Sequence, residues 1–125
     1  MSDPAERPVL LVVDDEPRIL SALQRCLRRE GYEIVAVEGA AAALRTLRER
    51  RVDALLTDHK MPGASGLELI REVATHWPGI PRLLLTGWAA EIAPEEIRGL
   101  GIRALVPKPW GDADLKARLR EALAR

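Results

Sequence analysis

Polar side chains that could perform chemistry directly follow four apolar runs of this 125-residue sequence. Asp14 and Asp15 follow the first run, Asp58 the third, Thr86 the fourth and Lys108 the fifth. If these runs form neighbouring parallel strands, their carboxyl ends meet at one edge of the sheet, where ligands bind in open α/β proteins. We therefore expect these five side chains to lie close together.

Asp58 is interpreted as a nucleophile that accepts a phosphoryl group. It is the one acid that ends an expected central strand alone. Three converging carboxylates would repel one another in a partly buried site, and a divalent cation removes that repulsion. Mg²⁺ prefers oxygen ligands and retains several waters. Asp15 and Asp58 could bind it directly, Asp14 through a water molecule, and the backbone carbonyl of Lys60 could complete the protein ligands.

Phosphoryl transfer needs positioning and charge neutralisation more than covalent chemistry from the protein. Mg²⁺ would neutralise one side of the transferred group and the Lys108 ammonium another. The Thr86 hydroxyl could donate a hydrogen bond to a third oxygen, and Gly87 would leave room for the group. The sequence predicts a catalytic set and a metal set, namely Asp58, Thr86 and Lys108, and Asp14, Asp15, Asp58 and Lys60.

Apolar runs and amphipathic stretches alternate five times along the chain. The expected strands are residues 9–13, 33–37, 54–57, 82–85 and 102–106, with helices between and after them. The pattern predicts an α/β fold: a doubly wound, five-stranded parallel sheet of order 2-1-3-4-5, a flavodoxin-like (βα)5 three-layer sandwich. We expect one domain over residues 1–125, with residues 1–8 as a loose tail.

Local signals predict how the helices begin and which faces they bury. Ser65 and Glu68 form a capping-box pattern, and Asp112 is expected to cap the last helix. The fourth helix must be short, because Pro94 cannot continue a helical hydrogen-bond ladder. Four residues are expected to share the inward face of the third helix: Leu67, Ile70, Ala74 and Trp77.

Composition restricts the classes of partner. Lys plus Arg and Asp plus Glu number 19 each, so no global field recruits nucleic acid or anionic lipid. No apolar run approaches the roughly 18 residues of a membrane span, and no signal-peptide pattern opens the chain. The single cysteine, Cys26, is expected to be buried and unreactive. We expect a cytoplasmic protein without direct nucleic-acid or membrane binding.

Taken together, the motifs resemble those of response regulator receiver domains, the CheY-like phosphoacceptors of two-component signalling. The resemblance covers residues 8–124 and rests on four stretches, namely Val12–Pro17, Asp58–Gly63 with Gly66, Leu85–Gly87 and Lys108–Trp110. It implies that Asp58 receives its phosphoryl group from a sensor histidine kinase, and that Lys108–Pro109 is a cis peptide bond. It also implies a signalling switch rather than an enzyme, one that catalyses only its own Mg²⁺-dependent phosphorylation and dephosphorylation.

Two features set this chain apart within the resemblance. Leu105 stands where the family usually carries Tyr or Phe, three residues before the lysine, so the usual aromatic readout is missing. The tryptophans Trp88 and Trp110 resemble those of receivers attached to hydrogenase-type transcription regulators or HD-GYP phosphodiesterases. The downstream partner is therefore expected to be an output domain or protein of such a kind, and homodimerisation is left open.

Lys60 and Trp88 stand two residues beyond Asp58 and Thr86, where they would flank the approach of a hydrolytic water. Lys60 can set its ammonium against phosphoryl oxygens, and Trp88 can cover the same opening. Neither side chain can orient a water molecule as an Asn or Glu side chain can. We expect the phosphorylated state to be long-lived.

Three alternatives remain beside this interpretation. A phosphatase with an Asp nucleophile usually needs a second acid where Lys60 stands, and we expect no cap domain for a substrate. A flavin or nucleotide module would need a glycine-rich loop after Val13, where two acids stand instead. A degenerate receiver used only for docking would not need the acids and Lys108.

Overall fold

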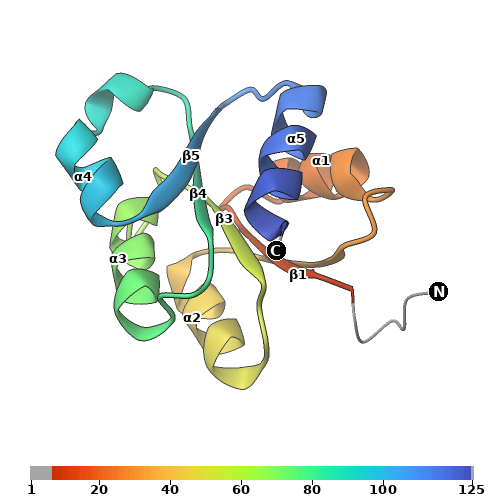
Figure 1. Cartoon of the computed structure of the whole chain (residues 1–125), viewed down its shortest axis with the longest axis horizontal. Helices are drawn as coiled ribbons and strands as arrows, with labels where there is room; N and C mark the ends of the chain where they lie inside the picture. The colour runs from red at the N-terminus through yellow and green to blue at the C-terminus, as the bar shows by residue number, and fades with distance from the viewer. Residues whose placement is uncertain (1–6, 125) are drawn as a thin grey trace.

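The computed structural model describes residues 7–124 and contains a five-stranded, all-parallel sheet of order β2-β1-β3-β4-β5 (Figure 1). The strands are β1 (Val9–Val13), β2 (Glu33–Val37), β3 (Ala54–Asp58), β4 (Arg82–Thr86) and β5 (Ile102–Pro107). The predicted strand order and fold class are confirmed. Most of the expected tail, residues 1–6, lies outside the described residues.

Helices cover both faces of the sheet. They are α1 (Pro17–Leu27), α2 (Ala40–Glu49), α3 (Gly66–His76), α4 (Pro94–Gly99), α5 (Asp112–Leu123) and the short 3₁₀ turn η2 (Ala89–Glu91). Leucines of α1 and α5 pack on one face of the sheet, and residues of α2 and α3 pack on the other. Figure 1 shows α1 and α5 together on one side and α2, α3 and α4 on the other. The result is the expected three-layer sandwich.

The buried parallel strands and their register explain why the functional residues meet. All residues of β1, β3 and β4 are buried, because both faces of these central strands are covered. The register pairs Val13 with Thr57, Asp58 with Leu85 and Thr86 with Pro107. The strands therefore end at one edge of the sheet.

Helix α3 differs in part from its prediction. The capping box of Ser65 and Glu68 is present. The inward face, however, consists of Leu69, Ile70 and Val73 together with Gly66, and Ile70 is the one predicted member among them. Leu67 and Trp77 only pack partly against the core, and Ala74 is half-buried. The close approach of Gly66 to β3, described below, sets the rotation of the helix.

Two smaller expectations also change. Gly111 occupies the cap position of α5, and Asp112 lies in the first turn without a capping hydrogen bond. Cys26 is half-buried rather than fully buried, and it lines an open groove of about 670 Å³ beside Trp110. Burial raises the pKa of the Cys26 thiol, with a further contribution from a hydrogen bond to Asp112, so the thiol is poorly ionised.

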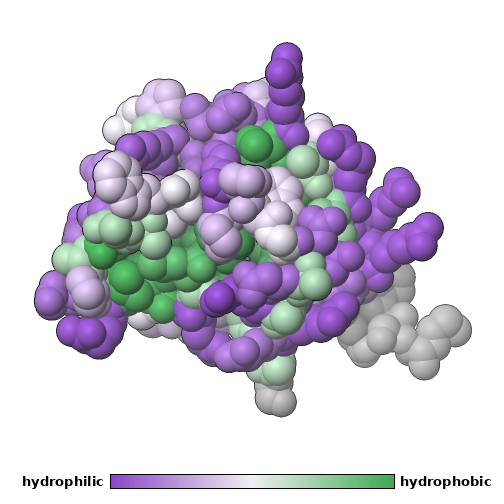
Figure 2. Space-filling view, turned by 90° about the horizontal axis from the view of Figure 1, so that it is seen from above, coloured by the Kyte–Doolittle hydropathy of each residue, from purple (hydrophilic) through white to green (hydrophobic). Residues whose placement is uncertain are grey.

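Helix α4 is the least buried of the α-helices between residues 7 and 124. None of its residues is buried, and Pro94 starts it as predicted. Beyond its C-terminal end, the buried side chain of Arg82 donates hydrogen bonds to the carbonyl oxygens of Leu100 (3.0 Å) and Ile80 (2.8 Å). Seen from above in Figure 2, the molecule is mostly hydrophilic, and its largest hydrophobic area lies on the side where Figure 1 draws α3 and α4.

None of the helices between residues 7 and 124 is long and apolar enough to cross a membrane.

Candidate functional site

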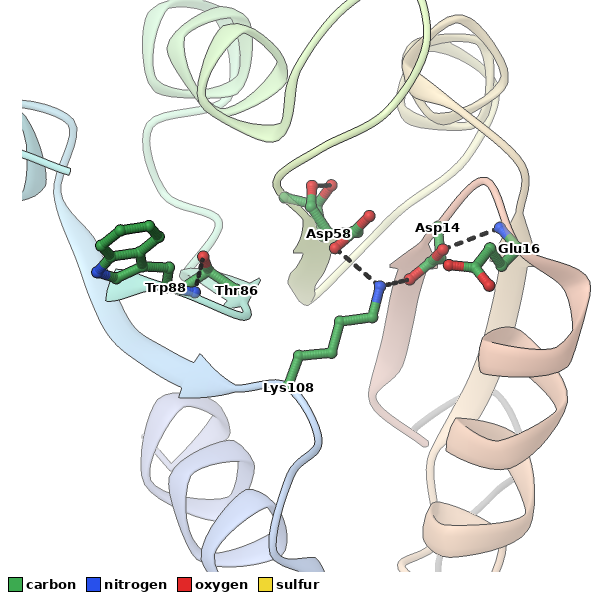
Figure 3. Close-up of polar contacts among 7 residues, drawn as sticks. Asp14, Glu16, Asp58, Thr86, Trp88 and Lys108 are labelled. Atoms are coloured by element: carbon green, nitrogen blue, oxygen red, sulfur yellow. Dashed lines mark hydrogen bonds and ion pairs between the residues drawn. The ribbon is translucent and has the colours of Figure 1, made fainter. Parts of the chain in front are cut away.

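Lys108 connects two acids at the carboxyl edge of the sheet. Its Nζ donates to Oδ2 of Asp14 and to Oδ1 of Asp58, each at 3.1 Å. Figure 3 shows the lysine side chain reaching from the end of β5 between the two carboxylates. The Lys108–Pro109 peptide bond is cis, as the resemblance implied. The structure thus brings together three predicted site residues from β1, β3 and β5.

Both carboxylate oxygens of Asp14 accept hydrogen bonds. Its side chain is 0% exposed. Oδ1 accepts a hydrogen bond from the backbone N–H of Glu16 at 2.9 Å, while Oδ2 faces Lys108. The first bond closes the turn from β1 into α1, and the second joins that turn to the end of β5. Asp14 therefore positions both the acidic turn and the lysine.

The charge states of this group follow from burial and from mutual contact. Burial raises the pKa of Asp58 above its ordinary value, the hydrogen bond from Lys108 opposes that rise, and the charge of Asp14 adds to it. Burial alone would lower the pKa of Lys108, but its hydrogen bonds to Asp14 and Asp58 outweigh burial and raise that pKa. At neutral pH Lys108 is a cation, and Asp58 is a carboxylate whose ionisation is disfavoured by its surroundings.

Thr86 is buried at the end of β4. Its Oγ1 accepts a hydrogen bond from the backbone N–H of Trp88 at 3.2 Å, which leaves the hydroxyl hydrogen available as a donor. Trp88 is 65% exposed, and its indole ring points away from Asp58 (Figure 3). Trp88 therefore borders the site without covering it with its ring, unlike the sequence expectation.

A cavity of about 260 Å³ opens between these residues. Its lining combines three acids, one hydroxyl, two lysines, a histidine, a glycine and a tryptophan: Asp15, Glu16, Asp58, His59, Lys60, Thr86, Gly87, Trp88 and Lys108. Carboxylate oxygens of Asp14, Asp15 and Glu16 lie within 4.8 Å of one another. Hard oxygen donors at this density suit a small divalent cation such as Mg²⁺. Asp15 and Asp58, from the predicted metal set, line this same cavity.

Lys60 differs from Lys108, the other lysine of the cavity, in the acid that it contacts. Its Nζ lies 3.0 Å from Oε1 of Glu91 rather than against the acids around Asp58. Sequence reasoning identified neither Glu91 nor Glu16. Glu16 carries a local signal, since it continues the acidic run after β1, whereas no sequence pattern pairs Glu91 with Lys60.

Gly66 fixes the backbone behind Asp58. Its N–H donates to the carbonyl oxygen of His59 at 2.7 Å. A Cβ at this position would collide with the carbonyl oxygen of Asp58. Only glycine permits this approach, so the first turn of α3 supports the strand end that presents the Asp58 carboxylate.

An open, doubly wound parallel sheet with a lysine-bridged acidic cavity at its carboxyl edge defines the class of α/β proteins that bind ligands at strand ends. Within that class, residues 10–120 match the sequence model of the response regulator receiver domain. The chain belongs to this family, whose members are signalling switches of two-component response regulators.

Named relatives agree with this assignment. The chain is 35% identical over 124 residues to the hydrogenase transcriptional regulatory protein HoxA of Cupriavidus necator, covering 98% of this chain and 25% of that protein. It is 35% identical over 118 residues to the probable transcriptional regulatory protein TcrX of Mycobacterium tuberculosis, covering 93% of this chain and 50% of that protein. The chain thus spans between a quarter and a half of the length of these relatives.

Solved structures show the same fold. The signal receiver domain of an HD domain-containing protein from Pseudomonas fluorescens Pf-5 superposes with a TM-score of 0.87 at 31% identity, covering 94% of this chain and 95% of that chain. The response regulator TrrA of Thermotoga maritima, solved in complex with Mg²⁺ and BeF, gives a TM-score of 0.85 at 31% identity, covering 93% and 99%.

Proposed function

We propose that this chain is a phosphoacceptor receiver domain that takes a phosphoryl group on Asp58 from a sensor histidine kinase and thereby switches an output partner. The observation that carries the proposal is the Lys108 bridge between Asp14 and Asp58, beside a cavity that Thr86 also lines. One cation, one hydroxyl and one acid that terminates a strand are the groups that phosphoryl transfer needs for positioning and charge neutralisation.

In the proposed reaction, a carboxylate oxygen of Asp58 attacks the phosphorus of a phosphohistidine. The P–N bond breaks, its electron pair returns to the imidazole, and an acyl phosphate forms on Asp58. The Lys108 ammonium contacts one phosphoryl oxygen, and the Thr86 hydroxyl donates to another. Burial raises the pKa of Asp58, and the Lys108 ammonium supplies positive charge against both the carboxylate and the phosphoryl group that it would carry.

The carboxylate-rich cavity supports Mg²⁺ as the cofactor. In the proposal, Asp15 and Asp58 would hold the ion directly, Asp14 would hold it through water, and the backbone carbonyl of Lys60 would complete the protein ligands. When bound, Mg²⁺ supplies positive charge against the phosphoryl oxygens and relieves repulsion among the acids. The TrrA structure contains Mg²⁺ with BeF, which supports the same chemistry here.

We also propose the extent of the domain, its compartment and the type of output that it controls. We propose a single receiver unit over residues 1–125 that works in the cytoplasm beside the kinase. The relatives support an output of the transcription-regulator type or one that carries an HD domain, since HoxA is named a transcriptional regulator and the Pseudomonas domain belongs to an HD domain-containing protein.

Labelling with a small phosphodonor tests the proposal. Incubation with acetyl phosphate and Mg²⁺ should add one phosphoryl group to the wild-type protein, as read by intact-mass spectrometry. Asp58→Asn should add none, and Asp112→Asn, which changes an exposed acid of α5, should label normally. Normal labelling of Asp58→Asn, or no labelling of the wild type, would contradict the proposal.

A further inference from the structure

An ion pair joins the two loops that flank the Asp58 cavity. Lys60 lies between β3 and α3, whereas Glu91, 31 positions later, ends the η2 turn between β4 and α4. Their Nζ and Oε1 atoms lie 3.0 Å apart. The pair therefore connects the loop that carries the phosphoacceptor to the segment that leads into α4.

The Lys60 ammonium has competing anionic partners. Its side chain lines the cavity that also contains Asp15, Glu16 and Asp58. Despite that local negative charge, the side chain is 75% exposed and its ammonium pairs with Glu91 at the rim. The position of the ammonium is therefore set by a balance between Glu91 and the site, and a phosphoryl group would add negative charge on the side of the site.

Glu91 is held in place by contacts that lead back to the site. Its backbone N–H donates to the carbonyl oxygen of Trp88 at 3.2 Å, and the Trp88 N–H donates to Oγ1 of Thr86. The next residue, Ile92, is 4% exposed and packs in the core. Glu91 thus projects from a short turn fixed at both ends, while Lys60 has a long and exposed side chain. Because the turn fixes Glu91 while the Lys60 side chain is long and exposed, the position of Glu91 determines where the ion pair forms.

We propose that Glu91 is a positioning residue that holds the Lys60 ammonium away from Asp58 and thereby sets the lifetime of the phosphoryl group. This inference rests on the proposed function. In hydrolysis, a water oxygen attacks the phosphorus, the bond between phosphorus and the Asp58 oxygen breaks, and its electron pair returns to the carboxylate. Inorganic phosphate leaves, and the proton lost by the water passes to phosphate or solvent.

Lys60 can oppose this reaction only when its ammonium reaches the phosphoryl oxygens. There it would occupy the approach of the attacking water and hold the oxygens in place. Pairing with Glu91 withdraws it to the rim. An exposed ion pair of this kind is weak and exchanges readily, so removing its acid shifts the balance toward the phosphoryl group.

The experiment measures decay of phosphorylated protein after acetyl phosphate is removed by desalting. Glu91→Gln should slow the decay about threefold or more, a change well resolved in a first-order rate. In a Lys60→Met background, Glu91→Gln should change nothing, because Glu91 acts through Lys60. Glu95→Gln, which removes an exposed acid from the first turn of α4, should decay like the wild type.

A direct readout of the pair needs no phosphorylation. In the metal-free protein, NMR signals of the Lys60 side chain, identified by their loss in Lys60→Met, should shift in Glu91→Gln and stay in place in Glu95→Gln. Unshifted signals in Glu91→Gln overturn the inference, as does an equal change of decay in both Lys60 backgrounds or none in either. If the wild type takes no phosphoryl group at all, both the proposed function and this inference are wrong. If the wild type is labelled normally, the outcomes above test the inference alone.

Discussion

The ammonium of Lys108 lies 3.1 Å from a carboxylate oxygen of Asp14, a residue that stands 94 positions earlier in the chain. The same ammonium reaches Asp58 at 3.1 Å. One cation therefore holds together two buried acids from the ends of β1 and β3. Removing the charge of Lys108 and removing the charge of Asp58 should therefore change the free energy of unfolding in opposite directions.

Lys108→Met should destabilise the protein. It leaves Asp14 and Asp58 side by side without a cation, which should lower the free energy of unfolding at pH 7 by about 1–3 kcal/mol. Because the folded protein raises the pKa of Lys108, this stabilisation is complete below the ordinary lysine pKa and is lost as the pH rises through the raised value. Urea denaturation in EDTA measures it. Lys116→Met, on α5, is the control, and equal stability of both variants would show that the bridge contributes nothing.

Asp58→Asn should stabilise the metal-free protein. Burial raises the pKa of Asp58, so the folded state is penalised for its ionised carboxylate at pH 7, and the amide removes this penalty. We expect a gain of roughly 0.5–2 kcal/mol that fades as the pH falls toward the ordinary carboxyl range, where the acid becomes protonated. Urea melts at pH 7 and pH 4 measure the difference. A gain that is as large at low pH would rule out ionisation as its cause.

Asp14→Asn should do the reverse and destabilise. Both oxygens of Asp14 accept hydrogen bonds, one from the Glu16 N–H and one from Lys108. Asparagine has a single oxygen, so its NH₂ group would face a donor. We expect a loss of about 1–3 kcal/mol in the same urea assay. A stability equal to that of Asp58→Asn would show that charge repulsion, rather than these two contacts, governs Asp14.

Mg²⁺ should raise the melting temperature of the wild-type protein. A ligand that binds only the folded state adds about 2.7 kcal/mol at a hundred times its Kd. Asp15→Asn should remove most of this effect, because it deletes one of the two proposed direct ligands. Asp112→Asn should respond to Mg²⁺ as the wild type does. A thermal titration with MgCl₂ distinguishes these cases, and a full response in Asp15→Asn would assign the ligand role elsewhere.

Gly66→Ala should displace the backbone that presents the Asp58 carboxylate. The added methyl group would meet the carbonyl oxygen of Asp58, which is backbone and cannot turn aside. We expect a loss of about 1–3 kcal/mol and slower labelling by acetyl phosphate. At Gly79 a Cβ would meet nothing within 4 Å, so Gly79→Ala is the matched control. Normal labelling of Gly66→Ala would show that the strand end tolerates the displacement.

The parts of the site that the sequence predicts are those fixed by strand ends. Asp14, Asp58 and Thr86 each follow a run of apolar residues, and a parallel sheet must bring such ends to one edge. The convergence of the charged groups with Lys108 therefore needed no knowledge of side-chain conformation.

Features that depend on side-chain direction or backbone approach could not be predicted in the same way. The inward face of α3 follows from the contact of Gly66 with β3, and the apolar spacing fits Leu67 and Ala74 as well as it fits Leu69 and Val73. The pairing of Lys60 with Glu91 joins two loops, where no periodicity specifies a partner.

Helix α4 has a consequence for local stability. It buries no residue, and its ends are tied by the packing of Ile92 and by the hydrogen bond from Arg82 to Leu100. Segments with few buried apolar contacts open at a small fraction of the free energy needed to unfold the whole domain. Amide hydrogens of α4 should therefore exchange with solvent well before those of β1 and β3. Rearranging this helix leaves the packing of the central strands intact, so a signal can change its position with little loss of core packing.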